Sequence, residues 1–327
     1  MRNILSPRPQ QPDTMGYAAR EIGIVPCALV FLADGGIGSP NLRKGDRFSY
    51  VAQAVTLNRS LLAARLPRLT IASNAPREIS DYLSRFEADL CPTVIPLASS
   101  LELPEGTPFY GAHFKLDLLE QMAQTLPEGK LLLLLDTDVI AQHGLDMDLL
   151  RRCHASGVGA FDISDQEFFA YGASRVIADL ERVAGRSLGN PRWFGGEFLL
   201  ASREFIDRLV PVARACFDRY RAVIGELHHQ GDEAFVSAAL NILSDEGQRI
   251  IDVGEYRAIG RHWSGNTHRD LRWFRHCALL HLPDCKTLLG REARQRTFSG
   301  ARVWRRIVVR HQMHRLVWLF RIYVRSR

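Results

Sequence analysis

Two acidic residues that follow a run of five leucines are the clearest candidates for chemistry in this 327-residue chain. The segment reads Lys-Leu-Leu-Leu-Leu-Leu-Asp-Thr-Asp, so Asp136 and Asp138 stand at the end of an apolar strand. Where the chain bends at a strand end, two carboxylates at this spacing can bind one cation. They favour a hard divalent ion, Mn²⁺ or Mg²⁺, which in turn binds diphosphate oxygens. The alternative is that the string is an ordinary turn.

A second acidic pair, Asp232 and Glu233, follows Gly231 and precedes an apolar helical pattern. Carboxylates at such a position can stabilise positive charge that develops during a reaction, or act as a nucleophile or base. Acidic residues in the first turn of a helix are also favoured by the helix dipole and can serve only as a cap. Both interpretations remain open for this pair.

The elements that must position these residues follow a simple pattern. Strand-like and helix-like segments alternate four times within the first 140 residues, which predicts an α/β fold with one open, doubly wound, mostly parallel sheet and helices on both faces. We expect strands within residues 24–33, 68–73, 91–97 and 130–135, and helices at 50–64 and from Thr107-Pro108 to about 126. The second half predicts helices near 164–183, 202–223 and 232–243 and a strand near 249–253.

Ligands of open α/β sheets bind beyond the carboxyl ends of the strands. Asp34, Asn74 and the Asp136 turn each follow an expected strand, and they are therefore predicted to line one site.

The order of these segments resembles the GT-A glycosyltransferases, most closely family 8, the glycogenin-like and bacterial lipopolysaccharide galactosyltransferase group. In that family a helix with a basic residue precedes the Asp-x-Asp strand, and Lys115 lies at the matching place. The segment Trp-Phe-Gly-Gly-Glu-Phe-Leu-Leu is similar to the family's Phe-Asn-x-Gly-Val-Leu-Leu, so the resemblance implies that Gly195 and Gly196 line the donor sugar. A tight turn before a buried strand is the alternative for these glycines.

Two later segments continue the resemblance. Gly-Asp-Glu-Ala is similar to the family's Asp-Gln segment, which implies a catalytic role for Asp232 and Glu233. His-Leu-Pro-Asp-Cys-Lys is similar to His-x-x-Gly-x-Lys, which implies that His281 completes the metal shell and that Lys286 meets the diphosphate. The implied activity is hexosyl transfer from a nucleotide-sugar, with uridine diphosphate as the carrier, to a glycan or lipid-linked acceptor.

The chain departs from the family pattern at four positions. Gly195 and Glu197 replace an Asn and a Gly, and Asp284 replaces a Gly beside the diphosphate. Glu233 replaces a Gln, and here the chain is similar to the blood-group transferases, which carry Phe-Gly-Gly and then Asp-Glu. The identity of the sugar and the stereochemistry are therefore not implied.

Two other functions are compatible with parts of the sequence. Residues 34–39, followed by Arg43-Lys44, resemble the Gly-rich loop of sugar nucleotidyltransferases, although the spacing to Arg43 is long. A non-catalytic, membrane-associated module that binds nucleotide-sugars is the other alternative, and an intact Asp-x-Asp argues against it.

Charge divides the chain into a body and a basic tail. The net charge is +6, and residues 301–327 contain eight Arg and no acidic residue, which leaves 6 − 8 = −2 for the remainder. Apolar side chains in the tail recur at helical spacing, which predicts an amphipathic helix on an anionic membrane surface, with a helix docked on the body as the alternative. The stripe comprises Val309, Met313, Leu316, Val317, Phe320 and Val324.

We therefore expect a flexible leader (1–20), a GT-A domain (21–290) and a membrane-associating tail (291–327). The six cysteines show no CxxC spacing, and the N-terminus lacks an apolar signal core. Both features predict a cytoplasmic protein. The basic tail on a near-neutral body predicts that it is peripheral on the inner face of the membrane and does not bind nucleic acid.

Overall fold

The computed structural model describes residues 22–32, 47–104, 106–265 and 268–325. The predicted leader, Asp34 and the Arg43-Lys44 pair lie outside these residues.

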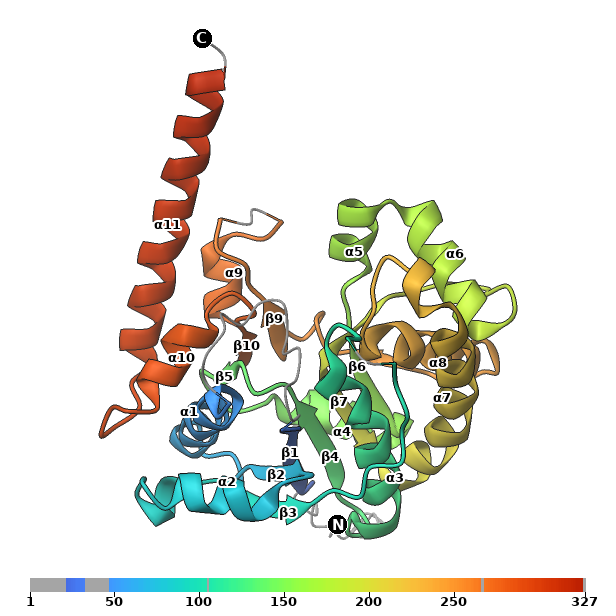
Figure 1. Cartoon of the computed structure of the whole chain (residues 1–327), viewed down its shortest axis with the longest axis horizontal. Helices are drawn as coiled ribbons and strands as arrows, with labels where there is room; N and C mark the ends of the chain where they lie inside the picture. Colours follow the sequence, from blue (N-terminus) through green and yellow to red (C-terminus); the bar gives the residue numbers. More distant parts are fainter. Residues whose placement is uncertain (1–21, 33–46, 105, 266–267, 326–327) are drawn as a thin grey trace, which may run out of the picture.

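One seven-stranded sheet forms the centre of the molecule, in the order β3-β2-β1-β4-β7-β6-β8 (Figure 1). The first four strands in this order are parallel to one another, whereas β7 runs antiparallel to both of its neighbours. Strand β4 is buried at all five positions, because it lies between β1 and β7 in a sheet covered on both faces. The strands are β1 (Ile24–Leu29), β2 (Thr70–Ser73), β3 (Thr93–Pro96), β4 (Leu131–Leu135), β6 (Val158–Asp162), β7 (Phe194–Ser202) and β8 (Ile251–Asp252).

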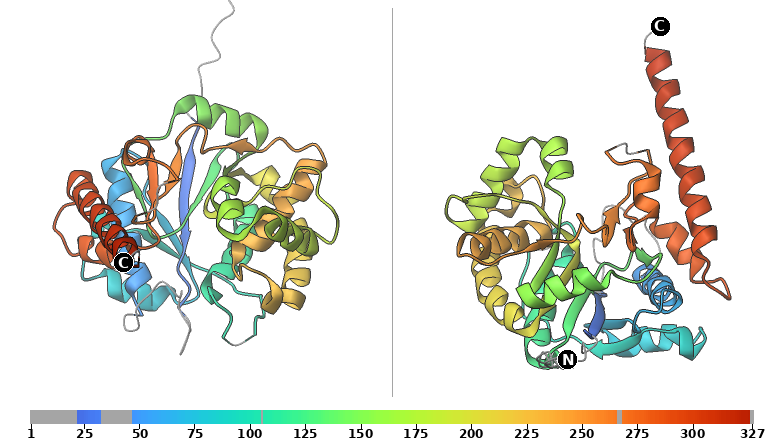
Figure 2. Two further views of the ribbon diagram at one scale, coloured as in Figure 1. Left: turned by 90° about the horizontal axis from the view of Figure 1, so that it is seen from above. Right: turned by 180° about the vertical axis from the view of Figure 1, so that it is seen from behind.

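Helices cover both faces of this sheet (Figure 2). On one side α3, α7 and α8 pack together, and on the other α1 packs against α10 and β5. The predicted doubly wound α/β fold is therefore confirmed. The helices are α1 (Ser49–Ala63), α2 (Pro76–Leu83), η1 (Ala88–Leu90), η2 (Tyr110–Phe114), α3 (Lys115–Thr125), α4 (Met147–Ser156), α5 (Ser164–Tyr171), α6 (Ala173–Ala184), α7 (Arg203–Val223), η3 (Ile224–Glu226), α8 (Asp232–Asp245), α9 (Leu271–Arg275), α10 (Lys286–Glu292) and α11 (Gly300–Arg325).

A second, three-stranded sheet stands beside the end of β4 and was not predicted from the sequence. Its order is β5 (Val139–Ala141), β10 (Leu279–His281) and β9 (Ile259–Arg261). Strand β5 follows β4 after a turn of three residues, so the Asp-x-Asp turn joins the two sheets. Strand β10 pairs antiparallel with β5, which brings a segment from near residue 280 to the end of β4.

The helix expected to begin at Thr107-Pro108 begins later, and the prediction of its start is wrong. The Thr107 hydroxyl donates to the carbonyl of Pro104 rather than capping a helix, and Phe109 follows in a left-handed conformation with φ of 55°. A residue in that conformation cannot lie inside an α-helix. The 3₁₀ helix η2 therefore begins only after it, at Tyr110, and α3 begins at Lys115.

Helix α11 is packed on the body only over its first part. Val303, Ile307 and His311 recur every four residues and are buried, the two aliphatic side chains in a small core with β10 and α10. Beyond His311 the helix projects from the body (Figure 2), and large apolar side chains there are more than half exposed: Met313, Leu316, Val317, Trp318, Leu319 and Phe320. Within the described residues no helix combines the length and the apolar character needed to span a bilayer.

Candidate active site

The three predicted metal ligands converge at the end of β4. Asp136, Asp138 and His281 each present a ligand atom, and these atoms lie within 4.8 Å of one another. The pairing of β5 with β10 explains the approach, because His281 is the register partner of Val139, the residue after Asp138. His281 Nε2 lies 3.2 Å from Asp138 Oδ1 and 3.9 Å from Asp136 Oδ2.

This donor set fits a divalent cation. Two carboxylates and one imidazole suit Mn²⁺, and the site is closed on one side because Asp138 and His281 are buried while the Asp136 side chain is 31% exposed. Burial opposes the charged form of His281, but Asp138 and Glu197 outweigh it and raise the pKa of His281 to about 9. A cation would therefore displace a proton from the imidazole.

Two lysines contact the same carboxylates. Lys286 Nζ, at the start of α10, pairs with Asp138. Lys115 Nζ, at the start of α3, lies 2.7 Å from Asp136 Oδ1 and 2.8 Å from Asp232 Oδ2, and donates to the carbonyl of Gly196 at 2.8 Å. Burial would lower the pKa of Lys115, but Asp136 and Asp232 reverse the effect and raise it, so the ammonium is charged and engages three acceptors.

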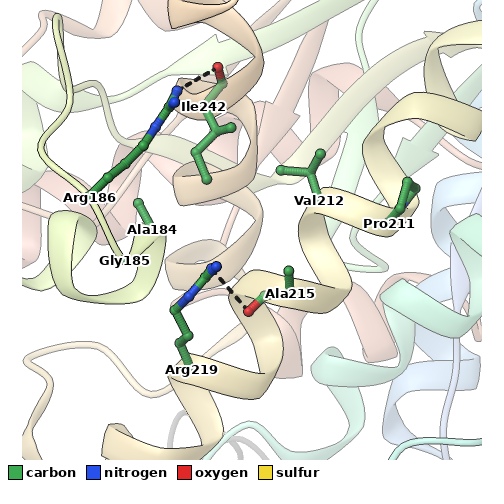
Figure 3. A pocket seen from close by; sticks show the side chains of 8 residues that line it. All are labelled: Ala184, Gly185, Arg186, Pro211, Val212, Ala215, Arg219 and Ile242. Atoms are coloured by element: carbon green, nitrogen blue, oxygen red, sulfur yellow. Dashed lines mark hydrogen bonds between the residues drawn. The ribbon is translucent and has the colours of Figure 1, made fainter.

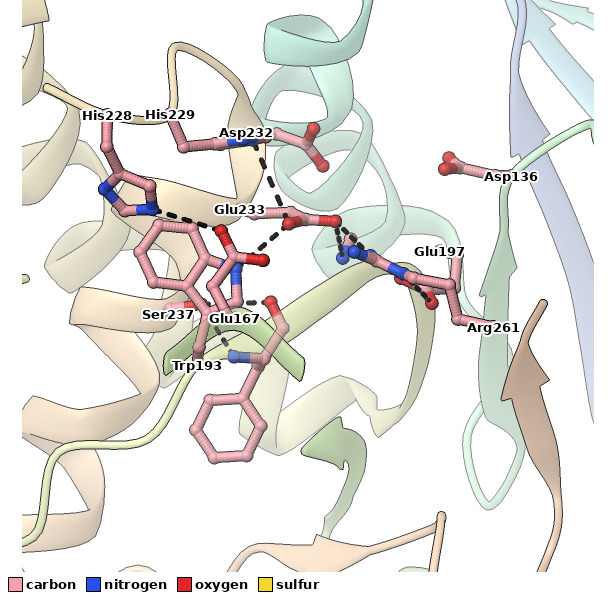
Figure 4. A network of polar contacts seen from close by, with 12 residues as sticks. Asp136, Glu167, Trp193, Glu197, His228, His229, Asp232, Glu233, Ser237 and Arg261 are labelled. Atoms are coloured by element: carbon pink, nitrogen blue, oxygen red, sulfur yellow. Dashed lines mark hydrogen bonds and ion pairs between the residues drawn. The ribbon is translucent and has the colours of Figure 1, made fainter. Parts of the chain in front are cut away.

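Asp232 and Glu233 lie in the first turn of α8, yet their carboxylates face other elements (Figure 4). Asp232 binds Lys115. Glu233 accepts hydrogen bonds from Trp193 Nε1 at 3.0 Å and from the Gly196 N–H at 3.1 Å. These contacts to β7, to the residue directly before it and to α3 favour a role in the site over the alternative of a helix cap.

The two carboxylates of this pair ionise differently. Burial is the largest influence on Asp232 and, together with Asp136 and Glu233, outweighs the attraction of Lys115 and raises its pKa. Burial opposes ionisation of Glu233 as well, but Arg261 outweighs it and lowers the pKa of Glu233 to about 2. Glu233 is therefore a fixed negative charge at neutral pH.

The two glycines of β7 make room for these acidic side chains. A Cβ on Gly195 would lie 2.2 Å from Glu197 Oε2, and a Cβ on Gly196 would lie 2.6 Å from Asp232 Oδ2. Both separations are far below contact distance, so a side chain at either position would displace these carboxylates. Neither glycine has a positive φ, and their need for glycine comes from close approach and not from a turn.

Two residues of the site were not predicted from the sequence. Arg261, in β9, contacts both Glu197 and Glu233 (Figure 4). In the sequence Glu197 stands out only as a departure from the family pattern, and in the structure it is completely buried. The only sequence signal for either was this unusual Glu in an apolar strand, because Arg261 lies in a stretch without a recognisable motif.

The remaining predicted residues are placed as follows. Asn74 is exposed at the end of β2, where its side-chain amide exchanges two 2.9 Å hydrogen bonds with the backbone of Leu32. Asp284 points away from Lys286, because its carboxylate accepts from the Ser264 N–H at 3.0 Å and from Arg310 Nε at 3.3 Å. The negative charge of Asp284 is therefore paired with Arg310 and is not directed at the predicted diphosphate site.

A separate hollow of about 420 Å³ lies between α6, α7 and α8, away from these residues (Figure 3). Its two guanidinium groups donate to backbone carbonyls, Arg186 to Ile242 and Arg219 to Ala215. The residues that line it include no carboxylate or nucleophile, so it adds nothing to the site: Ala184, Gly185, Arg186, Pro211, Val212, Ala215, Arg219 and Ile242.

Comparison with solved structures identifies the fold. The galactosyltransferase LgtC, in complex with donor and acceptor sugar analogues, aligns with a TM-score of 0.51 over 88% of this chain and 100% of LgtC, at 13% sequence identity. The chain has the GT-A fold. The sequence resemblance to family 8 is thus confirmed at the level of structure.

Two further GT-A neighbours align less closely. An active-site mutant of LgtC aligns at a TM-score of 0.49, with 12% identity over 88% of this chain and 95% of the mutant. Mouse xyloside xylosyltransferase 1, in its apo form, aligns at 0.42, with 14% identity over 80% of this chain and 97% of that protein. No protein-family model and no curated protein sequence matches the chain.

The raised pKa of His281 predicts a pH dependence of metal binding. The imidazolium dominates below pH 9 and cannot bind a metal, so Mn²⁺ affinity should rise by about tenfold per pH unit from pH 6 to 8. Calorimetric titration with Mn²⁺ in buffers of different ionisation enthalpy measures both the affinity and the proton released. His281→Ala should bind Mn²⁺ more weakly and lose this slope; an equal slope in both proteins would contradict the assignment.

Proposed function

We propose that this protein is a metal-dependent hexosyltransferase that transfers a sugar from a nucleotide-sugar, with uridine diphosphate as the carrier, to a glycan or lipid-linked glycan. The observation that carries the proposal is the convergence of Asp136, Asp138 and His281 within 4.8 Å, beside the ionised Glu233. The GT-A fold supports it independently.

The residues divide into two groups with different tasks. Asp136, Asp138 and His281 would hold Mn²⁺ or Mg²⁺, which when bound neutralises charge on the leaving diphosphate. Lys286 lies at the same edge and would add a positive charge to the diphosphate once released from Asp138. Glu233 would face the sugar and stabilise positive charge at the anomeric carbon, with Asp232 and Lys115 fixed behind it.

The projecting part of α11 supports a second proposal, on location. Its exposed apolar side chains are accompanied by Arg315 and Arg321, a composition that suits an anionic lipid surface. We place the protein on the cytoplasmic face of the membrane, where a lipid-linked acceptor for envelope polysaccharide or lipopolysaccharide synthesis would be presented. The membrane-facing segment begins after His311, because the residues before it pack on the body.

Donor binding tests the function directly. Uridine diphosphate at about 100 times its Kd should stabilise the protein by roughly 2.7 kcal/mol in thermal unfolding with Mn²⁺, and much less without it. Asp136→Asn should lose the Mn²⁺-dependent part, because Asp136 is a partly exposed ligand whose replacement leaves the core intact. Asp165→Asn, which removes an exposed carboxylate paired with Arg269, is the control.

Other outcomes of the same assay would favour the alternatives. Stabilisation by nucleoside triphosphates and not by uridine diphosphate would favour a sugar nucleotidyltransferase. Donor binding without hydrolysis or transfer would favour a non-catalytic binding module.

Glu233→Gln tests the reacting centre. The change keeps the shape of the side chain but removes the fixed negative charge, so turnover should fall by about 100-fold or more while donor affinity changes little. Initial rates of donor hydrolysis or transfer measure turnover, and titration measures affinity. Asp245→Asn, at the other end of α8, should leave both unchanged. Unchanged turnover in Glu233→Gln would assign the residue a structural role.

Deletion of residues 312–327 tests the location. The deletion removes four Arg and the exposed apolar side chains but keeps Val303 and Ile307 in place. Each basic residue near an anionic surface contributes about 1 kcal/mol, so full-length protein should sediment with anionic vesicles and the deletion variant should not. The variant should keep its Mn²⁺-dependent stabilisation by uridine diphosphate. Full-length protein that does not sediment with the vesicles would contradict the membrane assignment.

A further inference from the structure

A completely buried carboxylate joins the predicted metal site to the predicted reacting centre. Glu197 lies in β7, and its exposed fraction is 0%. Arg261 Nε donates to Glu197 Oε1 at 2.7 Å, and the same guanidinium contacts the other oxygen of Glu197 and one oxygen of Glu233 (Figure 4). The same oxygen, Glu197 Oε1, also lies 3.2 Å from His281 Nδ1.

The two nitrogens of His281 face different partners. Nε2 faces Asp138 and Asp136, whereas Nδ1 is buried and has no well-aligned hydrogen bond within the described part of the chain. The Glu197 carboxylate is the acidic group beside that nitrogen. Metal-binding histidines usually donate their second N–H to such a group, which fixes the tautomer and the ring orientation.

Two residues accommodate this buried carboxylate: Gly195 leaves space for it, and Arg261 neutralises its charge. Gly195 is required because any side chain there would occupy the position of Glu197 Oε2. Arg261 supplies the opposite charge, and together with His281 it outweighs the effect of burial and lowers the pKa of Glu197. Burial of a charge costs free energy, and an apolar side chain would fill this interior position without a glycine at 195 or an arginine at 261.

We infer that Glu197 is a positioning residue: it aims His281 Nε2 at the cation and, through Arg261, holds Glu233 in place. The inference rests on the proposed function, since it assigns a residue to that same site. It adds a residue at which the resembling family has glycine, and it makes the metal ligand and the reacting carboxylate dependent on one buried group.

The test is a double-mutant cycle in Mn²⁺ affinity, with Mn²⁺ alone as the probe. Free Mn²⁺ is followed by electron paramagnetic resonance, without donor or acceptor. Glu197→Gln keeps the volume and should weaken Mn²⁺ binding by about 10- to 100-fold. His281→Ala should also weaken it, and the double variant should bind no more weakly than His281→Ala, because Glu197 acts on the metal through His281.

A matched control separates positioning from general stability. Glu292 is about as buried and also pairs with an arginine, Arg302, but it is the last residue of α10, six residues after Lys286. Glu292→Gln should lower the thermal stability while leaving Mn²⁺ affinity unchanged. If Glu197→Gln does not fold, the double variant Glu197→Gln/Arg261→Gln replaces it in the test, because it removes one charge of each sign. The same loss of Mn²⁺ affinity is expected for this variant.

The outcomes distinguish this inference from the proposed function. Wild-type protein that binds neither Mn²⁺ nor Mg²⁺ would overturn both. Wild-type protein that binds Mn²⁺, with Glu197→Gln or its charge-balanced form binding equally well, would overturn only the role of Glu197. Additive losses in the cycle would do the same, since they would show that Glu197 does not act through His281.

Discussion

Charge balance at the edge of the sheet is the constraint on which the rest of the site depends. Five carboxylates gather where β4, β7 and α8 meet, and each would cost several kcal/mol to bury without an opposite charge. Three cationic side chains and one imidazole meet them, and they come from four different elements or their ends. The carboxylates are Asp136, Asp138, Glu197, Asp232 and Glu233, and the partners are Lys115, Lys286, Arg261 and His281.

This constraint accounts for features that otherwise look unrelated. The small sheet of β5, β10 and β9 brings in His281 and Arg261, so its pairing with the end of β4 delivers two of the partners. The glycines of β7 leave the space that two of the acidic side chains occupy. Removal of one partner would leave a buried charge unpaired, which typically costs 3–5 kcal/mol.

The sequence predicted the parallel half of the sheet well, because buried strands such as β4 are continuous apolar runs bounded by polar residues. Motif spacing predicted Asp136 and Asp138, and the resemblance to family 8 implied His281; the structure brings the three together. The sequence did not predict β5, β9 and β10, which are three residues each and carry no periodicity of their own. Their formation depends on pairing between segments about 140 residues apart, and local patterns do not record such pairing.

The same limit applies inside the site. Arg261 became a partner of Glu197 and Glu233 only through the position of β9, and no short motif surrounds it. Thr107-Pro108 shows the opposite error: a good local signal for a helix start was overridden by the left-handed residue Phe109. Residue types and short motifs predicted candidate functional residues. Which of these residues contact one another depends on strand pairing between distant segments.

The contact between Asp284 and Arg310 connects α11 to the segment that carries Lys286. Asp284 lies two residues before Lys286, and Arg310 lies in the last buried turn of the helix. From there the helix runs without interruption to Arg325, roughly 20 Å further at about 1.5 Å per residue. If this exposed part of α11 lies on a surface, its fixed attachment through Arg310 and its length would set how far the candidate site stands from that surface.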